Sequence, residues 1–202
     1  MKTCYIVGAG DFYGKFTPKE NDLVIAADGG YSLLSERGIR CDLIIGDMDS
    51  LSSTPTDVET IRFPIKKDET DTYLAYLEGK RRGYLHFEIY GGVGGRADHT
   101  FANYCLLSKI RSEGAYARLH DKDNVAFVIT NEATRVAGSE GNSISVFAFG
   151  GNASGVNIKG LLYELTDGIL EPNFPLGVSN SFTDREAEIS VSEGTLLIIA
   201  EI

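Results

Sequence analysis

The chain has 202 residues, enough for one large domain or two small ones, since a domain typically takes about 100 to 200 residues. Its 19 basic and 29 acidic residues give a formal net charge of −10, which argues against nonspecific binding to nucleic acid or to an anionic membrane surface. An anionic substrate would therefore need a local positive site or a metal ion.

The apolar run at 4–9 is interrupted by Gly8, so we expect it to be too short for a signal peptide or a membrane span. Cys4, Cys41 and Cys105 are widely spaced, stand in apolar surroundings and form no C-x-x-C pair. We expect them to be buried structural thiols in a protein of the reducing cytoplasm.

Three short apolar runs predict strands at Cys4–Val7, Leu23–Ala27 and 43–45, and each is followed by glycine and aspartate. The turn after the first run, Gly8-Ala9-Gly10-Asp11, resembles a phosphate-binding turn but lacks the full G-x-G-x-x-G spacing. The second run leads into Asp28-Gly29-Gly30. In open α/β sheets, ligands bind at the carboxyl ends of the strands. The pattern predicts an α/β domain with a mostly parallel, Rossmann-like sheet and a ligand site at that edge.

Two carboxylates follow the third expected strand, where Asp47 and Asp49 are separated only by Met48. In extended backbone, residues i and i+2 point the same way, so the two side chains would repel each other unless a cation lies between them. Mg²⁺ is the simplest cation for this position.

A further acidic stretch, Lys67-Asp68-Glu69-Thr70-Asp71, lies between an expected strand at 60–63 and an expected helix. Taken alone, this stretch favours a helix N-cap at Asp68 with Asp71 in the first helical turn. Considered together with the carboxylates after the third strand, Asp71 becomes a candidate third ligand of Mg²⁺.

Four glycines in five residues, at 91–95, connect an expected strand at 85–90 to another expected helix. Such a loop lets backbone amides close around phosphate oxygens, and Arg96 adds a guanidinium suited to phosphate. Taken singly, Asp98 is more typical of an N-cap and His99 of a helix surface. The inner face of the helix is expected to carry Phe101, Ala102, Cys105, Leu106 and Ile110.

After Gly114, short alternating runs are separated by glycine, asparagine and serine, and no helical period of useful length remains. The expected turn between the two halves is Asp121-Lys122-Asp123-Asn124. We therefore expect an α/β domain at 1–120 and an all-β sandwich domain at 121–202. The polar loop at 175–182 could hydrogen-bond a neutral heterocycle, although an ordinary turn accounts for its composition as well.

Five motifs together resemble the thiamine pyrophosphokinase family, most of all its bacterial branch, and they span both halves of the chain. In chain order they are Ala27-Asp28-Gly29-Gly30, Ile45-Gly46-Asp47-Met48-Asp49-Ser50, Lys67-Asp68-Glu69-Thr70-Asp71, Gly91-Gly92-Val93-Gly94-Gly95-Arg96-Ala97-Asp98-His99-Thr100 and Gly177-Val178-Ser179-Asn180. The resemblance implies transfer of a diphosphoryl group from ATP to the hydroxyethyl oxygen of thiamine, giving thiamine diphosphate and AMP. It also implies Mg²⁺ as cofactor and a homodimer, with thiamine between the α/β half of one subunit and the β half of the other.

The resemblance assigns roles to the residues at matching positions. Asp47, Asp49 and Asp71 match the carboxylates that hold Mg²⁺ and the triphosphate, and Asp98 joins them as a candidate catalytic residue. The candidate thiamine contacts are Asp98, Ser179 and Asn180. The candidate nucleotide contacts are Asp28, Gly29, Gly30, Asp68, Thr70, Gly92, Gly94, Gly95, Arg96 and His99.

Two alternatives remain open. One is a pyrophosphokinase of the same fold that acts on another heterocyclic alcohol such as a pterin, which would keep the three aspartates but need a different loop around Ser179. The other is a catalytically silent nucleotide-binding module that recruits a protein partner, which has no need for three clustered carboxylates. No nucleic-acid or membrane partner is expected.

Overall fold

The computed structural model describes residues 1–47, 55–64 and 66–201, and the chain forms two compact units. The first unit consists of Met1–Leu106 and Gly114–Lys122, and the second of Leu107–Glu113 and Asp123–Ile202. The chain enters the second unit for residues 107–113, returns to the first, and passes to the second again between Lys122 and Asp123.

The first unit is built on a parallel sheet. Its strands are β1 (Cys4–Val7), β2 (Leu23–Ala27), β3 (Leu43–Gly46), β4 (Glu59–Arg62), β5 (His86–Tyr90) and β6 (Tyr116–His120). They lie in the order β6-β5-β1-β2-β3-β4, and each neighbouring pair is parallel. All of β2 is buried, as expected in the middle of a parallel sheet with both faces covered. The strands expected from the apolar runs are confirmed, with small shifts at their ends.

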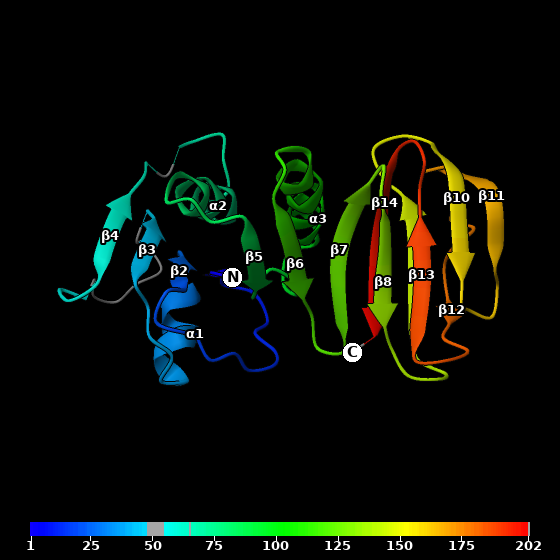
Figure 1. Ribbon diagram of the computed structural model, residues 1–202. Helices are drawn as coiled ribbons and strands as arrows, with labels where there is room; N and C mark the ends of the chain where they lie inside the picture. The colour runs from blue at the N-terminus through cyan, green and yellow to red at the C-terminus, as the bar shows by residue number, and fades with distance from the viewer. Residues whose placement is uncertain (48–54, 65, 202) are drawn as a thin grey trace. The chain divides into compact units, whose positions relative to one another are not determined.

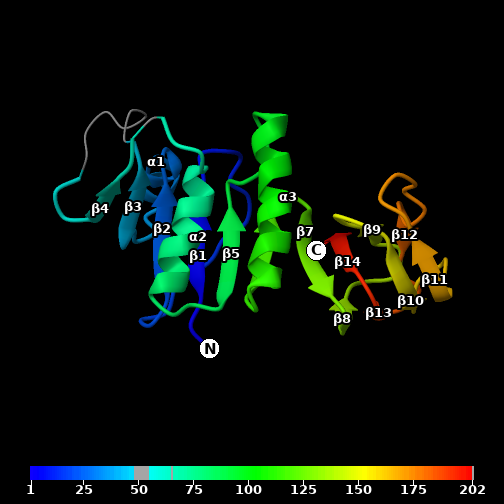
Figure 2. The ribbon, with the colours of Figure 1, turned by 90° about the horizontal axis from the view of Figure 1, so that it is seen from above.

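Helices α1 (Gly30–Glu36) and α2 (Asp71–Arg81) cover opposite faces of this sheet (Figure 1). Leu34 of α1 is buried in a cluster that includes Val7 and Val24. Helix α2 packs on β1, β2 and β3, and Figure 2 shows it lying along these strands. A side chain at Gly79 would come within 2.9 Å of Cys4 Sγ, so the glycine permits this close packing.

Helix α3 (Ala97–Ser112) follows β5, but its buried face differs from the predicted one. Phe101 is 63% exposed and Cys105 is also exposed, so the predictions of burial for these two residues were wrong. The buried residues of the helix include Asn103, Leu106, Leu107 and Ile110. Their spacing is helical, but the face includes an asparagine, which apolar periodicity alone does not predict.

The start of α2 differs from the predicted cap. The N-cap is Thr70 rather than Asp68, and Thr70 Oγ1 accepts a hydrogen bond of 3.2 Å from the backbone N–H of Tyr73. Asp71 is the first residue of the helix, where the helix dipole stabilises a carboxylate. Asp98 likewise lies inside the first turn of α3 rather than at its N-cap. Among the described helices, none has both the length and the apolar character needed to cross a membrane.

The second unit is β-rich, and its strands form antiparallel sheets in the orders β12-β9-β14-β7 and β11-β10-β13-β8. Both sheets contribute to one hydrophobic core, in which Ile144 and Ile198 belong to the first and Val156 and Ile189 to the second. The strands are β7 (Asn124–Thr130), β8 (Ala133–Ala137), β9 (Ser143–Ala148), β10 (Ala153–Lys159), β11 (Leu165–Leu170), β12 (Asn180–Ser181), β13 (Glu186–Ser190) and β14 (Thr195–Glu201).

An ion-pair network joins the C-terminal end of α2 to β4. Glu78 Oε1 lies 2.6 Å from both Arg81 Nη2 and Arg82 Nε, and Arg82 Nη2 lies 2.6 Å from Glu59 Oε1. The hydrogen bonds from Arg81, together with those from Arg82, lower the pKa of Glu78 from 4.5 to about 2. The ionised carboxylate of Glu78 therefore stabilises the folded first unit.

We expect Glu78→Gln to lower the melting temperature at neutral pH, because it removes this ionised carboxylate. Since the folded-state pKa is depressed, the stabilisation is fully present above pH 4.5 and is lost as the pH falls through about 2. The difference in melting temperature between wild type and variant should therefore shrink over this range, as measured by circular dichroism. Glu36→Gln is the control, because Glu36 is 70% exposed and lies 4.0 Å from Arg37. A difference that stays constant with pH would contradict the prediction.

Candidate active site

The carboxyl ends of the parallel strands carry the loops that the sequence singled out. The loop after β1 is bound to the loop after β5 by backbone hydrogen bonds of 2.8 Å, from Gly8 N to Tyr90 O and from Gly10 N to Gly91 O. A further bond of 2.8 Å runs from Asp11 N to Val93 O. The weak turn motif at residues 8–11 and the glycine-rich loop therefore form one connected structure.

Glycine is required where these loops meet. Gly91 has a φ of +60°, and an added Cβ atom would collide with the carbonyl oxygen of Gly8. At the start of α1, an added Cβ atom on Gly30 would collide with the carbonyl oxygen of Val7. The backbones after β1, β2 and β5 can approach this closely only because both positions lack a side chain.

Asp28 stands between β2 and α1 in a left-handed conformation, with a φ of +50°. Its N–H donates a 2.8 Å hydrogen bond to Ile45 O, and an added Cβ atom on Gly46 would lie 3.2 Å from Asp28 Cα. Asp28 is therefore adjacent to the end of β3, where Asp47 follows. Strained backbone of this kind in a residue other than glycine concentrates at functional sites.

Asp71 begins α2 close to the same edge. A Cβ atom on Gly8 would lie 3.8 Å from Thr72 Oγ1, which places the first turn of α2 beside the end of β1. Asp71 Oδ1 is buried, accepts no hydrogen bond from the described residues and lies 2.8 Å from Lys67 Nζ in an ion pair. The Lys67 side chain is only 11% exposed. The ammonium group therefore offsets part of the cost of burying this carboxylate.

Two of the three predicted metal ligands, Asp47 and Asp71, belong to the described residues. Asp47 is partly buried directly after β3, whereas Asp49 lies outside the described residues. Over 1–47, 55–64 and 66–201, no group of three histidine, cysteine, aspartate or glutamate side chains is placed to hold a metal ion. The chemistry of the donors fits Mg²⁺, since Asp47 and Asp71 offer carboxylate oxygens and Asp71 Oδ1 is a buried oxygen that accepts no hydrogen bond from the described residues.

Arg96 and Asp98 form a bidentate ion pair beyond the glycine-rich loop. Arg96 Nη2 lies 2.6 Å from Asp98 Oδ2 and Nε lies 3.1 Å from Oδ1, with side chains that are 70% and 64% exposed. Hydrogen bonding from Arg96 holds the pKa of Asp98 below its usual value. A carboxylate with a lowered pKa is a good acceptor but a weak general base.

Ser179 and Asn180 lie in the second unit, at the start of β12. Ser179 has a φ of +57°, and its N–H donates to Ser145 Oγ at 3.1 Å. Asn180 is only 5% exposed; its Nδ2 donates to Tyr163 O at 2.7 Å, and its Oδ1 accepts from Tyr163 N at 2.9 Å. The amide of Asn180 therefore shapes its own loop.

Asn103 of α3 was not predicted as a site residue, yet it contacts the glycine-rich loop at 91–95. Its Nδ2 donates a 2.7 Å hydrogen bond to Gly92 O. The available signal was a polar residue at helical spacing from Leu106 and Ile110 on the inner face of the helix.

Comparisons with known proteins identify the same family that the sequence motifs resemble. A family model described as thiamin pyrophosphokinase, catalytic domain, matches residues 17–119, and one described as thiamin pyrophosphokinase, vitamin B1 binding domain, matches residues 128–196. The thiamine pyrophosphokinase of Bacillus subtilis is 28% identical over 216 residues, covering 98% of each chain.

Solved structures extend the similarity. The crystal structure of the Bacillus subtilis thiamine pyrophosphokinase has a TM-score of 0.90 at 25% identity, with 98% of each chain covered. That from Geobacillus thermodenitrificans has a TM-score of 0.85 at 25% identity, covering 99% of this chain and 97% of its own. The thiamin pyrophosphokinase of Candida albicans, at 14% identity, shares the fold with a TM-score of 0.76, covering 98% of this chain and 89% of its own. With family models matching both halves, the chain belongs to the thiamine pyrophosphokinase family.

Proposed function

We propose that this chain transfers a diphosphoryl group from ATP to the hydroxyl group of thiamine, giving thiamine diphosphate and AMP. The observation that carries the proposal is the match of a catalytic-domain model to the first half and a vitamin B1 binding model to the second. Connected loops at the carboxyl edge of a parallel sheet support it, since ligands bind at this edge in open α/β sheets.

Asp47, Asp49 and Asp71 would hold Mg²⁺ together with the triphosphate of ATP. When bound, Mg²⁺ would neutralise phosphate charge and orient the diphosphoryl group. A net charge of −10 makes such neutralisation necessary before an anionic nucleotide can approach. The partly buried ion pair between Lys67 and Asp71 supports the phosphate part of this role, because it fixes a positive charge at the start of α2.

The nucleotide side of the site would consist of backbone and a few side chains. Glycine-rich turns at Asp28-Gly29-Gly30 and at 91–95 would offer amides to phosphate oxygens, and Arg96 would add a guanidinium. Thr70 already caps α2, so it would act by holding the helix N-terminus in place next to Asp68. His99 and Asp98 stand exposed at the start of α3, and Asp98 would accept a hydrogen bond from thiamine rather than act as a strong base.

The thiamine side would come from Ser179 and Asn180 of a second copy of the chain, in a homodimer. An interface between copies is supported by the large apolar side chains that the second unit leaves exposed between residues 162 and 178, since a contiguous apolar patch is typical of an interaction surface. These exposed side chains are Leu162, Tyr163, Ile169, Phe174, Leu176 and Val178.

We also propose a finer description of the architecture and location. The parallel sheet at 1–120 would be a Rossmann-like nucleotide-binding domain, and the two sheets at 121–202 a thiamine-binding β-sandwich. The free thiols support the predicted cytoplasmic location, although only Cys4 is fully buried as predicted, Cys41 being partly buried and Cys105 exposed.

Neither alternative function is favoured. A pterin pyrophosphokinase would not account for the vitamin B1 binding model over residues 128–196. A silent nucleotide-binding module would not account for the full length of similarity to a thiamine pyrophosphokinase.

The direct test is to incubate the purified protein with ATP, Mg²⁺ and thiamine and to separate the products by chromatography. We expect thiamine diphosphate and AMP in equal amounts, with AMP formed only when thiamine is present. AMP formed only with a pterin alcohol would support the first alternative. Nucleotide binding without turnover would support the second.

Asp49→Asn should lower kcat/KM by roughly 100-fold or more, because a catalytic metal supplies several kcal/mol of charge stabilisation. The substitution preserves size, so the melting temperature should stay close to that of the wild type. Asp57→Asn, at an exposed position in the segment before β4, is the matched control and should leave activity unchanged. Full activity in the Asp49 variant would exclude this aspartate as a metal ligand.

Asn180→Ala should raise the KM for thiamine more than the KM for ATP, because it removes the bonds that shape the loop around Ser179. Asn157→Ala is the matched control, since Asn157 Nδ2 donates to Gly155 O at 3.2 Å and its Oδ1 accepts from Asp167 N at 3.0 Å. The control should lower the melting temperature without changing the ratio of the KM for thiamine to the KM for ATP. An equal rise of both KM values in the Asn180 variant would show that the loop around Ser179 does not contact thiamine.

A further inference from the structure

Asn103 occupies an unusual position for its residue type. It is 6% exposed and shares the buried face of α3 with Leu106. Asparagine is seldom buried unless its polar atoms are hydrogen-bonded. A leucine would complete an apolar helix face at this position, so the amide needs a specific explanation.

The explanation lies in the glycine-rich loop. Asn103 Nδ2 donates to Gly92 O at 2.7 Å. The fit is tight, because an added Cβ atom on Gly92 would lie 2.6 Å from Leu119 Cδ1 and 3.1 Å from Asn103 Nδ2. The amide group and the glycine backbone therefore occupy neighbouring positions with no room for a side chain between them.

With this hydrogen bond, the four consecutive carbonyl oxygens of residues 90–93 all accept hydrogen bonds. The carbonyl oxygens of residues 90, 91 and 93 accept hydrogen bonds from the N–H groups of Gly8, Gly10 and Asp11, and Asn103 binds the carbonyl oxygen of residue 92. Each carbonyl oxygen points opposite to the N–H of the next residue, because peptide bonds are planar and trans. The donors of residues 90, 91 and 93 lie in the loop after β1, so the N–H groups of residues 91, 92 and 94 turn away from that loop, whereas the N–H of Val93 turns away from Asn103 on α3.

We infer that Asn103 is a positioning residue, whose side-chain amide sets the orientation of the Gly92–Val93 peptide so that the loop amides are prepared for the phosphate oxygens of ATP. Glycine at position 92 leaves the Gly92–Val93 peptide free to rotate. The side-chain N–H of Asn103 fixes this peptide by donating to its carbonyl oxygen, which prepares the loop before the nucleotide binds. This inference rests on the proposed function, in which the loop at 91–95 binds the nucleotide.

Asn103→Asp tests the inference with almost no change in volume. The donor is replaced by an oxygen that faces the carbonyl oxygen of Gly92. We expect the Kd for an α,β-methylene analogue of ATP with Mg²⁺, and the KM for ATP, to rise about tenfold or more, since a buried polar group left unsatisfied destabilises the loop conformation that binds phosphate. The KM for thiamine should change less than about twofold.

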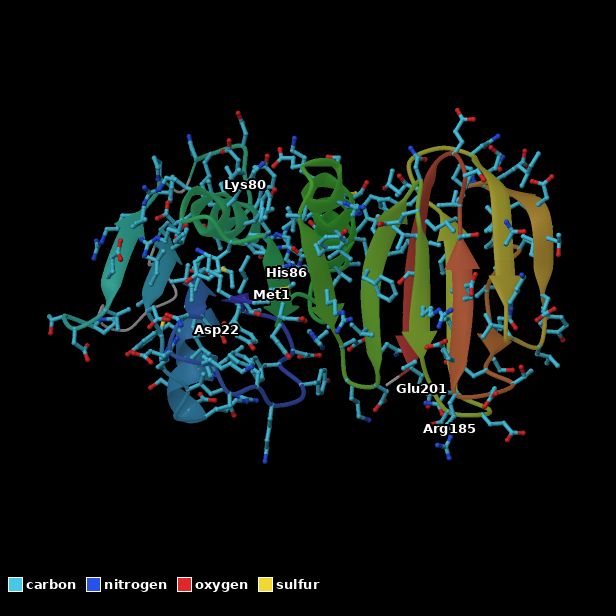
Figure 3. The ribbon with its side chains drawn as sticks, in the orientation of Figure 1. Met1, Asp22, Lys80, His86, Arg185 and Glu201 are labelled. Atoms are coloured by element: carbon cyan, nitrogen blue, oxygen red, sulfur yellow. The ribbon has the colours of Figure 1, made fainter. Side chains whose placement is uncertain are left out.

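Asp22→Asn is the matched control, because it replaces a carboxylate by an amide at another buried site of the first unit. Asp22, labelled in Figure 3, is 7% exposed, and its carboxylate accepts from Thr3 N at 2.8 Å and from Lys19 N at 2.9 Å. It precedes β2, at the amino end of the strand. We expect this variant to lower the melting temperature and to leave nucleotide binding unchanged.

If both variants lower only the melting temperature and the Kd of the Asn103 variant matches that of the wild type, Asn103 has a purely structural role and the inference is wrong. If Asn103→Asp does not fold, Asn103→Ser, which withdraws the donor from Gly92 O, must show the same selective rise in Kd. A wild-type protein that binds the analogue without making thiamine diphosphate would exclude the proposed function, while the ratio of Kd values would still decide the role of Asn103. A wild-type protein that does not bind the analogue would exclude both.

Discussion

The parallel pairing of β1 with both β2 and β5 is the constraint on which the rest of the first unit depends. It brings the ends of strands that are distant in sequence to one edge, where Gly8 and Gly91 touch backbone to backbone. Side chains at either position would force the loops apart. The glycines at this edge are therefore needed first for packing, and a loop shape suited to phosphate follows from it.

Electrostatics impose a second constraint on this edge. An acidic protein that uses an anionic nucleotide must concentrate positive charge locally, and Lys67 and Arg96 stand beside carboxylates near the proposed nucleotide site. The two pairs differ in surroundings, since Lys67 is largely buried whereas Arg96 is exposed. The Lys67–Asp71 pair is therefore part of the folded framework, whereas Arg96 is free to exchange Asp98 for a stronger anionic partner.

Two buried asparagines illustrate how the fold supports its loops. Asn103 in the first unit and Asn180 in the second each use the side-chain amide to hold backbone of a glycine-containing or strained segment. Neither role is visible from residue type, because asparagine is common in turns and on surfaces. Only the burial of each residue, together with the identity of its partner, separates a supporting amide from an ordinary polar side chain.

The sequence by itself determined the α/β first half, the β-rich second half and the acidic and glycine-rich segments, because apolar periodicity and glycine placement are local properties. The same local patterns failed for Phe101 and Cys105, and for the cap at Thr70. Burial of one helix face and the geometry of one helix end depend on what packs against them. Tertiary structure alone decided that Asn103 reaches Gly92, since this contact depends on how α3 packs beside the loop after β5.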